Sequence, residues 1–465
     1  MERRRGWSGG LWVVAVVLVV AALVSGVISA LRPDASVASP ATALGGSAGT
    51  SGDWTQYRGD LAGTGNNPDA SINTANVARL APRWTFGPQR IFASTAAIVG
   101  GTVYAVNDKS LYAFDLKSGA ALWHYDDIGN PYGAVLSSSV AVDPATHIAY
   151  YGTPDARVYA VNTITHQGVW NVQLGDPAHG AFIWSSPLLA NGKLYIGLAS
   201  HQDSPCILGA AFALDLATGA VDWRRDLAPA GTLGASVWSS ISADATHHTL
   251  FVTTGNPCEQ TRVIAQEDAI VGLDWDTGAV LWQYTALHDD SCDCDFGQGA
   301  AAFALDGGEY VVAGSKYGVV YAITPPAVSG QPARLMWSLR ITGAGYLGGA
   351  GIYAPPAYAD GRVFVAGGPT LDGACRGALW ALDARTGAPL WRTCTAGQVV
   401  GAPAISGGVL FVPQSNVVVG YDVASGRTIW SAKIAGETWG GAAVAGSSLV
   451  VGTVSGSLYC FGLPG

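Results

Sequence analysis

Short stretches of alternating apolar and polar residues repeat along most of this chain, and the same kind of turn joins them in pairs. Five copies match well: "SLYAFDLKSGAALWHY", "AAFALDLATGAVDWRR", "AIVGLDWDTGAVLWQY", "ALWALDARTGAPLWRT" and "VVVGYDVASGRTIWSA". Each copy contains an alternating stretch, a D-x-x-(S/T)-G turn and a second stretch with one tryptophan. Alternation on both sides of a glycine turn is typical of a β-hairpin. The pattern therefore predicts a chain built from hairpins.

The tryptophans of these hairpins allow the repeats to be counted. Degenerate copies end in "THQGVW" and "PARLMW", and a half-copy, "LAPRWTF", lies near the start. The recurring tryptophans are Trp84, Trp123, Trp170, Trp223, Trp282, Trp337, Trp391 and Trp430. Another pair of short strands, such as "KLYIGLAS" or "TLFVTTGN", precedes most of them. Eight units of four strands predict an all-β, eight-bladed β-propeller with antiparallel blades.

The two ends of the repeat predict how the ring closes. The last unit, "SLVVGTVSGSLYCFG", lacks its tryptophan strand, whereas residues 80–86 form such a strand without a unit. We expect this N-terminal strand to complete the last blade, because closure removes two exposed sheet edges. Each recurring tryptophan should cover the neighbouring blade and bury about 150–250 Å². These eight rings are therefore assigned to adhesion between blades and not to a cofactor.

Ahead of the repeats, the alternation gives way to an uninterrupted apolar run. Residues 11–31 carry no charge and are long enough to span a bilayer. Arginines before the run and an acidic chain after it predict a transmembrane anchor with the propeller on the extracytoplasmic side. A cleaved signal peptide is the alternative, and it leads to the same compartment. Residues 32–52 read as a flexible linker and residues 53–465 as the propeller.

Charge and composition narrow the classes of partner. Only 12% of the residues are charged, and the formal net charge is −9. A nucleic-acid partner is not expected, because phosphate binding needs a concentrated basic face. The low charge and the 62 glycines fit many short, buried strands joined by tight turns.

Seven cysteines in an oxidising compartment make disulfides possible. Cys375 and Cys394 flank one repeat unit and form the first candidate pair, and Cys206 and Cys258 lie at similar points of adjacent units and form the second. Cys292, Cys294 and Cys460 remain, and spacing alone does not decide their connectivity. The chain contains no C-x-x-C-H motif, so covalent haem of that type is not expected.

The D-x-x-T-G-x-x-x-W unit, which runs through residues 80–465, resembles the repeat of pyrroloquinoline quinone (PQQ) dehydrogenases. The opening segment "DWTQYRGDLAGTGNNPDASINTANVARLAPRW" is also similar to the beginning of that family's propeller. The same repeat is used by scaffold propellers such as the outer-membrane assembly lipoprotein BamB. A function therefore has to be argued from the site and not from the repeat.

More specific similarity lies in the fourth to sixth repeats. "GASVWSSISAD" followed by "LFVTTGNPC" resembles the segment that places a tryptophan under the quinone and binds calcium through an asparagine, here Trp238 and Asn256. "HDDSCDCDFGQGAA" resembles the element with the aspartate base beside the metal, here Asp293 or Asp295. "VVAGSKYGVVYAI" resembles the strand pair whose basic residue contacts the quinone oxygens, here Lys316.

The chemistry of alcohol oxidation by a quinone suits these residue types. Calcium prefers oxygen ligands and can polarise the reactive carbonyl. A carboxylate can take the hydroxyl proton, an indole offers a flat stacking face, and a lysine stabilises charge on the quinone oxygens. Residues 291–299 should lead from the outer strand of one blade into the innermost strand of the next. Their aspartates can then reach the mouth of the central channel.

Each of these residues also has a structural interpretation. Trp238, like its counterpart Trp184 in "FIWSSP", can stack on the cofactor or can simply fill the channel. Asn256 can serve a Gly-Asn-Pro turn, and Lys316 can sit in a solvated hairpin turn. A zinc cluster in "SCDCD" is disfavoured, because its cysteines lack the C-x₂₋₄-C spacing. A local disulfide or separate cross-links are preferred there.

Two features depart from the pattern of the PQQ alcohol dehydrogenases. The chain has no pair of adjacent cysteines. The glutamate that serves as their third metal ligand has no counterpart near "KLYIGLAS", where "ASHQDSPC" offers only Asp203 or Gln202. His288 is interpreted as a loop residue. His247 and His248 lie in the predicted turn "DATHHTL" and receive no function.

The leading hypothesis is a membrane-anchored, extracytoplasmic oxidoreductase that binds PQQ and calcium and oxidises a small-molecule alcohol. Electrons would pass to a separate external acceptor, because a haem motif is missing. The residues assigned are Asp293 and Lys316 to catalysis, Trp238, Asn256, Lys316 and Trp184 to the cofactor, and Asn256, Asp293, Asp295 and Asp203 to the metal. The alternative is a non-catalytic propeller that binds a protein or a cell-envelope ligand.

Overall fold

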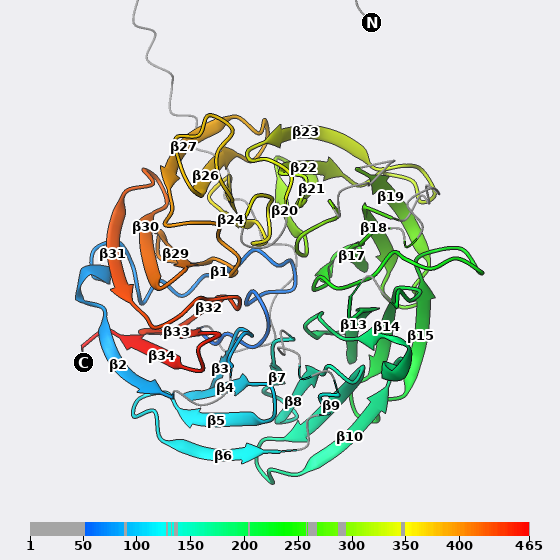
Figure 1. The fold of residues 1–465 in the computed structure, drawn as a ribbon, viewed down its shortest axis with the longest axis horizontal. Coiled ribbons are helices and arrows are strands. Elements are labelled where there is room, and N and C mark those ends of the chain that lie inside the picture. Colours follow the sequence, from blue (N-terminus) through cyan, green and yellow to red (C-terminus); the bar gives the residue numbers. More distant parts are fainter. Residues whose placement is uncertain are drawn as a thin grey trace, which may run out of the picture. The chain divides into compact units, whose positions relative to one another are not determined.

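The described part of the chain is a ring of eight four-stranded antiparallel sheets. This computed structural model describes residues 52–87, 91–126, 129–131, 133, 138–202, 205–256, 258, 267–286, 294–345 and 349–464. The chain divides into Met1–Ser39, which lies outside these residues, and Pro40–Gly465, which contains every described strand. Figure 1 shows the sheets in circular order around a common centre. The predicted eight-bladed all-β propeller is confirmed.

Blades 1 to 4 follow the chain from the innermost to the outermost strand. Blade 1 contains β3 (Ala97–Val99), β4 (Thr102–Val106), β5 (Leu111–Asp115) and β6 (Ala121–Tyr125). Blade 2 contains β7 (Ala141–Asp143), β8 (Ile148–Gly152), β9 (Arg157–Asn162) and β10 (Gly168–Gln173). Blade 3 contains β12 (Leu188–Ala190), β13 (Lys193–Ser200), β14 (Ala210–Asp215) and β15 (Val221–Asp226), with β11 (Ala181–Phe182) added to β13. Blade 4 contains β16 (Ser242–Asp244), β17 (Thr249–Thr253), β18 (Ala269–Asp274) and β19 (Val280–Thr285).

Blades 5 to 7 repeat the same order. Blade 5 contains β20 (Ala301–Leu305), β21 (Gly308–Gly314), β22 (Val319–Thr324) and β23 (Arg334–Arg340). Blade 6 contains β24 (Ala357–Ala359), β25 (Arg362–Gly367), β26 (Ala378–Asp383) and β27 (Pro389–Cys394). Blade 7 contains β28 (Ala404–Ser406), β29 (Val409–Gln414), β30 (Val417–Asp422) and β31 (Thr428–Lys433), with β1 (Asn66–Asn67) parallel to β28. Two short 3₁₀ helices are η1 (Val77–Arg79) and η2 (Pro177–His179).

Blade 8 joins the two ends of the repeat. It contains β32 (Ala442–Ala445), β33 (Ser448–Gly452), β34 (Leu458–Gly462) and, as its outermost strand, β2 (Ala81–Phe86). Trp84 in β2 lies opposite Cys460 in β34. The N-terminal strand thus completes the last blade, as the sequence predicts.

Burial along the strands explains their sequence pattern. In β17, a second strand, all five residues are buried, because the neighbouring blades cover both faces of the sheet. In β27, an outermost strand, exposed residues alternate with half-buried ones over the second half of the strand. Inner strands therefore read as continuous apolar runs, and outer strands read as alternating ones.

The recurring tryptophans connect each blade to the next one. Six indole N–H groups donate to main-chain oxygens of the following blade: Trp84 to Leu116, Trp170 to Leu216, Trp223 to Trp275, Trp337 to Ala384, Trp391 to Val423 and Trp430 to Leu80. Blade adhesion, predicted for these rings, is confirmed for these six.

The D-x-x-T-G turn of a blade contacts the indole of the preceding blade. In blade 3, Asp215 Oδ1 accepts the N–H and the hydroxyl of Thr218 at 2.8 and 2.7 Å, which fixes the turn. Gly219 follows with φ +73°, and a Cβ there would lie 2.6 Å from the ring of Trp170. The turn therefore needs glycine both for its left-handed backbone and for contact with the preceding blade. In the degenerate second blade, His166 takes this place and stacks on Trp123 at 4.8 Å.

Residues 54–67, termed the central segment, contact the innermost strand of every blade and lie in blue at the centre of the ring in Figure 1. From blade 1 to blade 8 the contacts are Trp54 with Ile98, Thr55 with Val142, Gln56 with Leu189, Leu61 with Ala243, Ala62 with Ala302, Thr64 with Tyr358, Gly65 with Ile405 and Asn67 with Val444. One extended segment thus pairs its polar groups with all eight sheets.

Replacing Gly65 with alanine should destabilise the ring more than replacing an unconfined glycine. Gly65 has φ +68°, and a Cβ there would lie 2.8 Å from the oxygen of Pro403. Gly446 has φ +51° and open space around its Cα, so Gly446→Ala isolates the backbone cost of about 1–2 kcal/mol. Chemical unfolding of both variants measures the difference. Equal losses would contradict a tight fit of the central segment.

A line of hydroxyl groups links the connections that enter successive blades. Thr95 accepts the N–H of Gly441 at 2.6 Å, and Ser139 accepts that of Thr95 at 3.0 Å. Ser186 then accepts the N–H of Ser139 at 3.0 Å, and Ser240 accepts that of Ser186 at 2.9 Å. Short hydroxyl side chains therefore fix five neighbouring blade entrances around the axis.

The predicted membrane anchor of residues 11–31 and the linker of residues 32–52 fall almost wholly outside the described residues. Among the described residues, no helix combines the length and the apolar character that a membrane span needs.

Candidate functional site

The antiparallel order of the blades separates two ends of the ring. The connections between blades and the turns between second and third strands lie at one end, termed the site face. The turns between first and second strands and between third and fourth strands lie at the other end, termed the turn face. Trp238, Asn256, Asp295 and Lys316 all fall on site-face connections or turns of blades 4 and 5. Topology alone therefore brings these distant stretches to one end.

Asp295 forms the centre of a compact polar group on this face. Its Oδ1 lies 2.6 Å from Nζ of Lys316, and its Oδ2 accepts the indole N–H of Trp238 at 2.8 Å. The ammonium of Lys316 also lies over the ring of Trp238, 4.9 Å from the centroid. A carboxylate, an ammonium and an indole from three separate segments therefore hold one another in place.

The local backbone fixes this group before the side chains meet. Asp295 begins the approach to β20, and its carbonyl accepts the N–H of Lys316 at 2.7 Å. Phe296, which follows Asp295, and Ser315, which precedes Lys316, form an antiparallel bridge. The turn that holds Lys316 then closes at Gly318, whose N–H donates to Ser315 at 2.9 Å. Two short main-chain contacts thus join the connection and the turn.

Burial separates these side chains from the solvent. The side chain of Asp295 is 4% exposed and that of Lys316 is 11% exposed, whereas Trp238 is half-buried. The interpretation of Lys316 as part of a solvated turn is therefore wrong. An ion pair at low dielectric is strong when its remaining groups are hydrogen-bonded, as the Trp238 contact provides.

Asn256 and Glu267 lie in the connection between β17 and β18 of blade 4. The side-chain oxygens Oδ1 of Asn256 and Oε1 and Oε2 of Glu267 are buried. Both residues border Gly234, where a Cβ would lie 2.6 Å from Oε1 of Glu267 and 2.9 Å from the carbonyl oxygen of Asn256. At Gly255, a Cβ would lie 3.0 Å from Oδ2 of Asp295. Because Gly234 and Gly255 lack a Cβ, the carboxylates of Glu267 and Asp295 can lie close to the backbone there.

The sequence pattern did not single out Glu267. A glutamate was expected near "KLYIGLAS" in blade 3, whereas this buried glutamate belongs to blade 4, where Asp268 separates it from β18. The acidic pair in "QEDAIVGLD" was the available signal. Charged side chains are seldom buried, so a glutamate just ahead of an apolar strand, where it becomes buried, is unusual.

Trp184 belongs to an aromatic group of its own. Its ring stacks on Phe182 at 4.2 Å and is nearly parallel to His201 at 6.1 Å. Its N–H donates to the carbonyl of Ser200, whose N–H donates in turn to Ser236 Oγ. Burial lowers the pKa of His201. The group borders the segment that leads to Trp238, but the described contacts of Trp184 are to blade 3.

Asp293 and Asp203, which the sequence analysis assigned to the site, lie outside the described residues, as does His288, which was interpreted as a loop residue. Gln202, the alternative to Asp203, is exposed. Of the two aspartates in the alternating run, Asp295 is therefore the one whose contacts are known.

The two predicted disulfides are present. Cys206 bonds to Cys258 with a Cα separation of 6.0 Å, and Cys375 bonds to Cys394 with a separation of 5.2 Å. The first disulfide joins blades 3 and 4 on the site face, two residues beyond Asn256. Cys294 is disulfide-bonded as well, while Cys460 is free and buried. The connection predicted for Cys292 lies outside the described residues.

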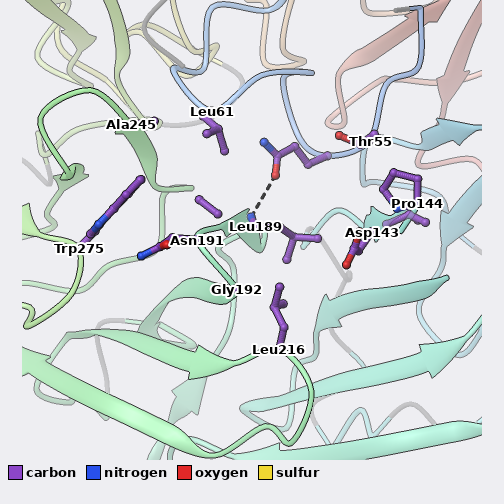
Figure 2. Close-up of a pocket in the computed structure, with 13 residues that line it drawn as sticks. Thr55, Leu61, Asp143, Pro144, Leu189, Asn191, Gly192, Leu216, Ala245 and Trp275 are labelled. Carbon is purple, nitrogen blue, oxygen red and sulfur yellow. Dashed lines mark hydrogen bonds between the residues drawn. The ribbon is translucent and has the colours of Figure 1, made fainter. Parts of the chain in front are cut away.

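A cavity of about 400 Å³ lies on the turn face (Figure 2). Thr55, Gln56 and Leu61 of the central segment line one side, and turns of blades 2 to 4 line the other. Gln56 holds this wall by accepting the N–H of Leu189 at 3.1 Å, the dashed line in Figure 2. The cavity is remote from Asp295, because a strand of five or six residues, about 17–20 Å long, separates the two faces.

An eight-bladed propeller with a carboxylate, an amine and an indole grouped at one face is the arrangement that the sequence resemblance to PQQ dehydrogenases predicts. A family model described as the β-propeller domain of glucose, ethanol and alcohol dehydrogenases matches residues 54–333. A second model, described as outer membrane protein assembly factor BamB, matches residues 333–458. The chain belongs to the first family, the PQQ dehydrogenase β-propellers, and the predicted resemblance is confirmed.

Individual relatives agree with this assignment. The chain is 26% identical over 415 residues to a polyvinylalcohol dehydrogenase of Pseudomonas sp, a match covering 77% of this chain and 63% of the relative. It is 27% identical over 295 residues to a quinoprotein ethanol dehydrogenase of Pseudomonas putida, covering 49% of this chain and 46% of the relative. A europium-containing methanol dehydrogenase shares the fold, with a TM-score of 0.75, 18% identity and coverage of 89% and 98%. The chain thus spans less than two thirds of these curated relatives.

Proposed function

We propose that this protein oxidises an alcohol with PQQ and a bound cation at the site face. The observation that carries the proposal is the buried carboxylate of Asp295, held by Lys316 on one oxygen and by Trp238 on the other. Membership in a family of dehydrogenase propellers supports it.

The residues present fit a flat, anionic cofactor. Trp238 offers a half-buried indole, and the ammonium of Lys316 lies above the plane of that ring. A planar ligand that stacks on this face of the indole would have to displace the ammonium from over the ring to the edge of the ligand. Stacking on an aromatic face and pairing with a cation are the two interactions that such a ligand needs.

The residues also fit a hard cation. Asn256, Glu267 and Asp295 supply amide and carboxylate oxygens, which Ca²⁺ prefers and which lanthanide ions share. Gly234 and Gly255 let two of these carboxylates approach the backbone. We propose Glu267 for the ligand position that the sequence analysis gave to Asp203. We propose calcium as the resident ion, and the europium-containing neighbour makes a lanthanide the competing ion to test.

The bound quinone would supply the acceptor for the two electrons that leave the alcohol. Asp295 would take the hydroxyl proton, because it is an anionic oxygen beside the indole platform. Lys316 balances the carboxylate charge in the buried site. The Trp238 N–H prevents rotation of the carboxylate, so that one oxygen keeps a fixed direction. An orienting partner of this kind improves proton transfer by holding the reacting geometry.

Adding PQQ with Ca²⁺ to the purified propeller should give stoichiometric, micromolar or tighter PQQ binding and alcohol-dependent reduction of an artificial dye. Isothermal titration measures the binding independently of turnover. Parallel arms contain La³⁺ in place of Ca²⁺, and ethanol or polyvinyl alcohol as substrate. Glu267→Gln should weaken cation binding by about tenfold or more, since it removes a charged ligand.

The outcomes separate the possibilities. If PQQ does not bind at micromolar concentration in the presence of either cation, the enzyme proposal fails. If PQQ binds and no alcohol reduces the dye, the cofactor site stands and the proposed substrate class is wrong.

We propose an extracytoplasmic location for the propeller. The Cys206–Cys258 and Cys375–Cys394 disulfides support it, since such bonds persist in oxidising compartments. The anchor of residues 11–31 remains a prediction, which fractionation of the full chain would test. A separate electron acceptor is part of the proposal, because this chain carries no C-x-x-C-H motif.

The second candidate is a non-catalytic scaffold that binds a protein or a cell-envelope ligand. The match of the BamB model to residues 333–458 favours it. That region contains the outermost strand of blade 5, the whole of blades 6 and 7 and the first two strands of blade 8, whereas the polar group on the site face lies on connections and turns of blades 4 and 5. Failure of PQQ binding would leave this candidate.

A further inference from the structure

A second cluster of potential ligands lies on the turn face, far from the site described above. Asp244 ends β16, His247 lies in the turn that follows, and Glu309 lies in β21 of the next blade. One ligand atom from each residue falls within 4.8 Å of the others. Within the described ranges, this is the one such group of three histidine, cysteine or acidic residues. The cluster therefore spans the junction of blades 4 and 5.

The contacts within the cluster are direct. Nδ1 of His247 contacts Oδ2 of Asp244 and lies 3.6 Å from Oε2 of Glu309. The other oxygen of Asp244 accepts the N–H of Thr246 at 2.7 Å, which fixes the carboxylate in the turn. Such outer contacts orient a ligand before an ion arrives.

In the part of the chain that the structure describes, His247 is the one potentially cationic group in contact with these carboxylates, and a single imidazolium balances at most one of their two charges. Asp244 is fully buried, and the side chain of Glu309 is 15% exposed. Among the described residues, no lysine or arginine pairs with either carboxylate, and Oε1 of Glu309 is buried without a hydrogen-bond partner. Two adjacent carboxylates at low dielectric are stable when a cation lies between them.

The ligand types select the ion. One imidazole nitrogen and two carboxylate oxygens form a three-ligand set for Zn²⁺, which binds at about 2.0–2.2 Å and takes water at its fourth position. His247 is 61% exposed, so water can reach that position. Calcium is disfavoured, because it requires six to eight oxygen ligands. Zinc would also neutralise the two negative charges.

We propose that Asp244, His247 and Glu309 bind a zinc ion that cross-links blades 4 and 5. These are the two blades that carry Asp295 and its partners at the opposite face, so the ion would fix their mutual orientation. The proposal stands independently of the proposed oxidoreductase activity, because it depends on turn-face residues alone. Its consequence is stability, since an ion that binds the folded ring stabilises it by mass action.

The experiment titrates Zn²⁺ into chelator-treated, purified protein by calorimetry and follows thermal unfolding with and without the ion. We expect one zinc equivalent per chain with micromolar or tighter affinity and a higher Tm. His247→Ala and the isosteric Glu309→Gln should each weaken the affinity by more than about tenfold and abolish the Tm shift. Because His247 is exposed, its removal should leave the ring folded.

The chain provides a matched control in η2. His179 lies 2.6 Å from Asp176 with the same three-residue spacing, and both side chains are largely exposed. This pair is not part of any three-ligand group among the described residues. His179→Ala should therefore keep full zinc binding. Undiminished zinc binding by His247→Ala, absence of a zinc equivalent in the wild type, or displacement by millimolar Ca²⁺ would each overturn the proposal.

Discussion

Replacing Asp295 with asparagine should reduce PQQ-dependent alcohol oxidation by about 10²- to 10⁴-fold, the contribution of a positioned acid–base group. The amide keeps the size of the side chain and can still accept the N–H of Trp238, but it cannot take a proton from the substrate. Steady-state dye reduction at saturating alcohol measures the loss. Calorimetric binding of PQQ should change far less than turnover.

The same substitution at Asp293 is the matched control, because the two aspartates flank one cysteine and both were candidates for the base. Full activity of Asp295→Asn together with loss in Asp293→Asn would assign the base to Asp293. Asp295→Asn also leaves the buried Lys316 without its anion, so the fold must be checked by circular dichroism. The double variant Asp295→Asn with Lys316→Met removes both charges and should be folded and inactive.

Replacing Trp84 with alanine should lower the free energy of unfolding by about 3–5 kcal/mol, because the indole of Trp84 packs blade 8 against blade 1, where the propeller closes. Its indole donates to the carbonyl of Leu116 at 2.9 Å and lies against Gly119 of blade 1. Without it, β2 would lose its main contact with the following blade. Urea unfolding followed by tryptophan fluorescence and circular dichroism measures the change.

Two further variants separate the contributions of the Trp84 indole to the free energy of unfolding. Trp84→Phe keeps an aromatic ring and loses the hydrogen bond, so it should cost about 1 kcal/mol plus the lost ring area. Leu122→Ala, at a 53% exposed position of β6, should change stability by less than about 0.5 kcal/mol. If Trp84→Ala were as stable as Leu122→Ala, closure of the ring would not depend on this side chain.

The architecture could be predicted because its determinants are local or lie between adjacent repeats. The turn at Asp215 is stabilised by contacts within four residues, and Gly219 receives the tryptophan of the preceding unit. Each repeat therefore carries the signal for its own strands and for its neighbour. Even closure by β2 could be read, because the missing strand at one end matched the spare strand at the other.

The meeting of the candidate side chains was predicted in part, whereas their functions stay predictions. The sequence pointed to Trp238 and Lys316, and the structure brings them together around one carboxylate. The sequence did not decide between Asp293 and Asp295, because both aspartates fit the same motif. They are two residues apart, so the motif matches equally well with either side chain in the site. Glu267 was missed, because the expected ligand was sought in the neighbouring blade.

What the sequence by itself determined is the repeat: the hairpins, the count of eight, the tryptophan contacts and the closure of the ring. What only the tertiary structure decided is which polar groups meet where two blades pack. Examples are Asp295 with Lys316 and Trp238, and Asp244 and His247 with Glu309. The physical reason is that hydrophobic periodicity specifies the orientation of a strand, whereas contacts across blade junctions depend on the register of two separately folded sheets. Such contacts produce no periodic pattern of apolar and polar residues in the sequence.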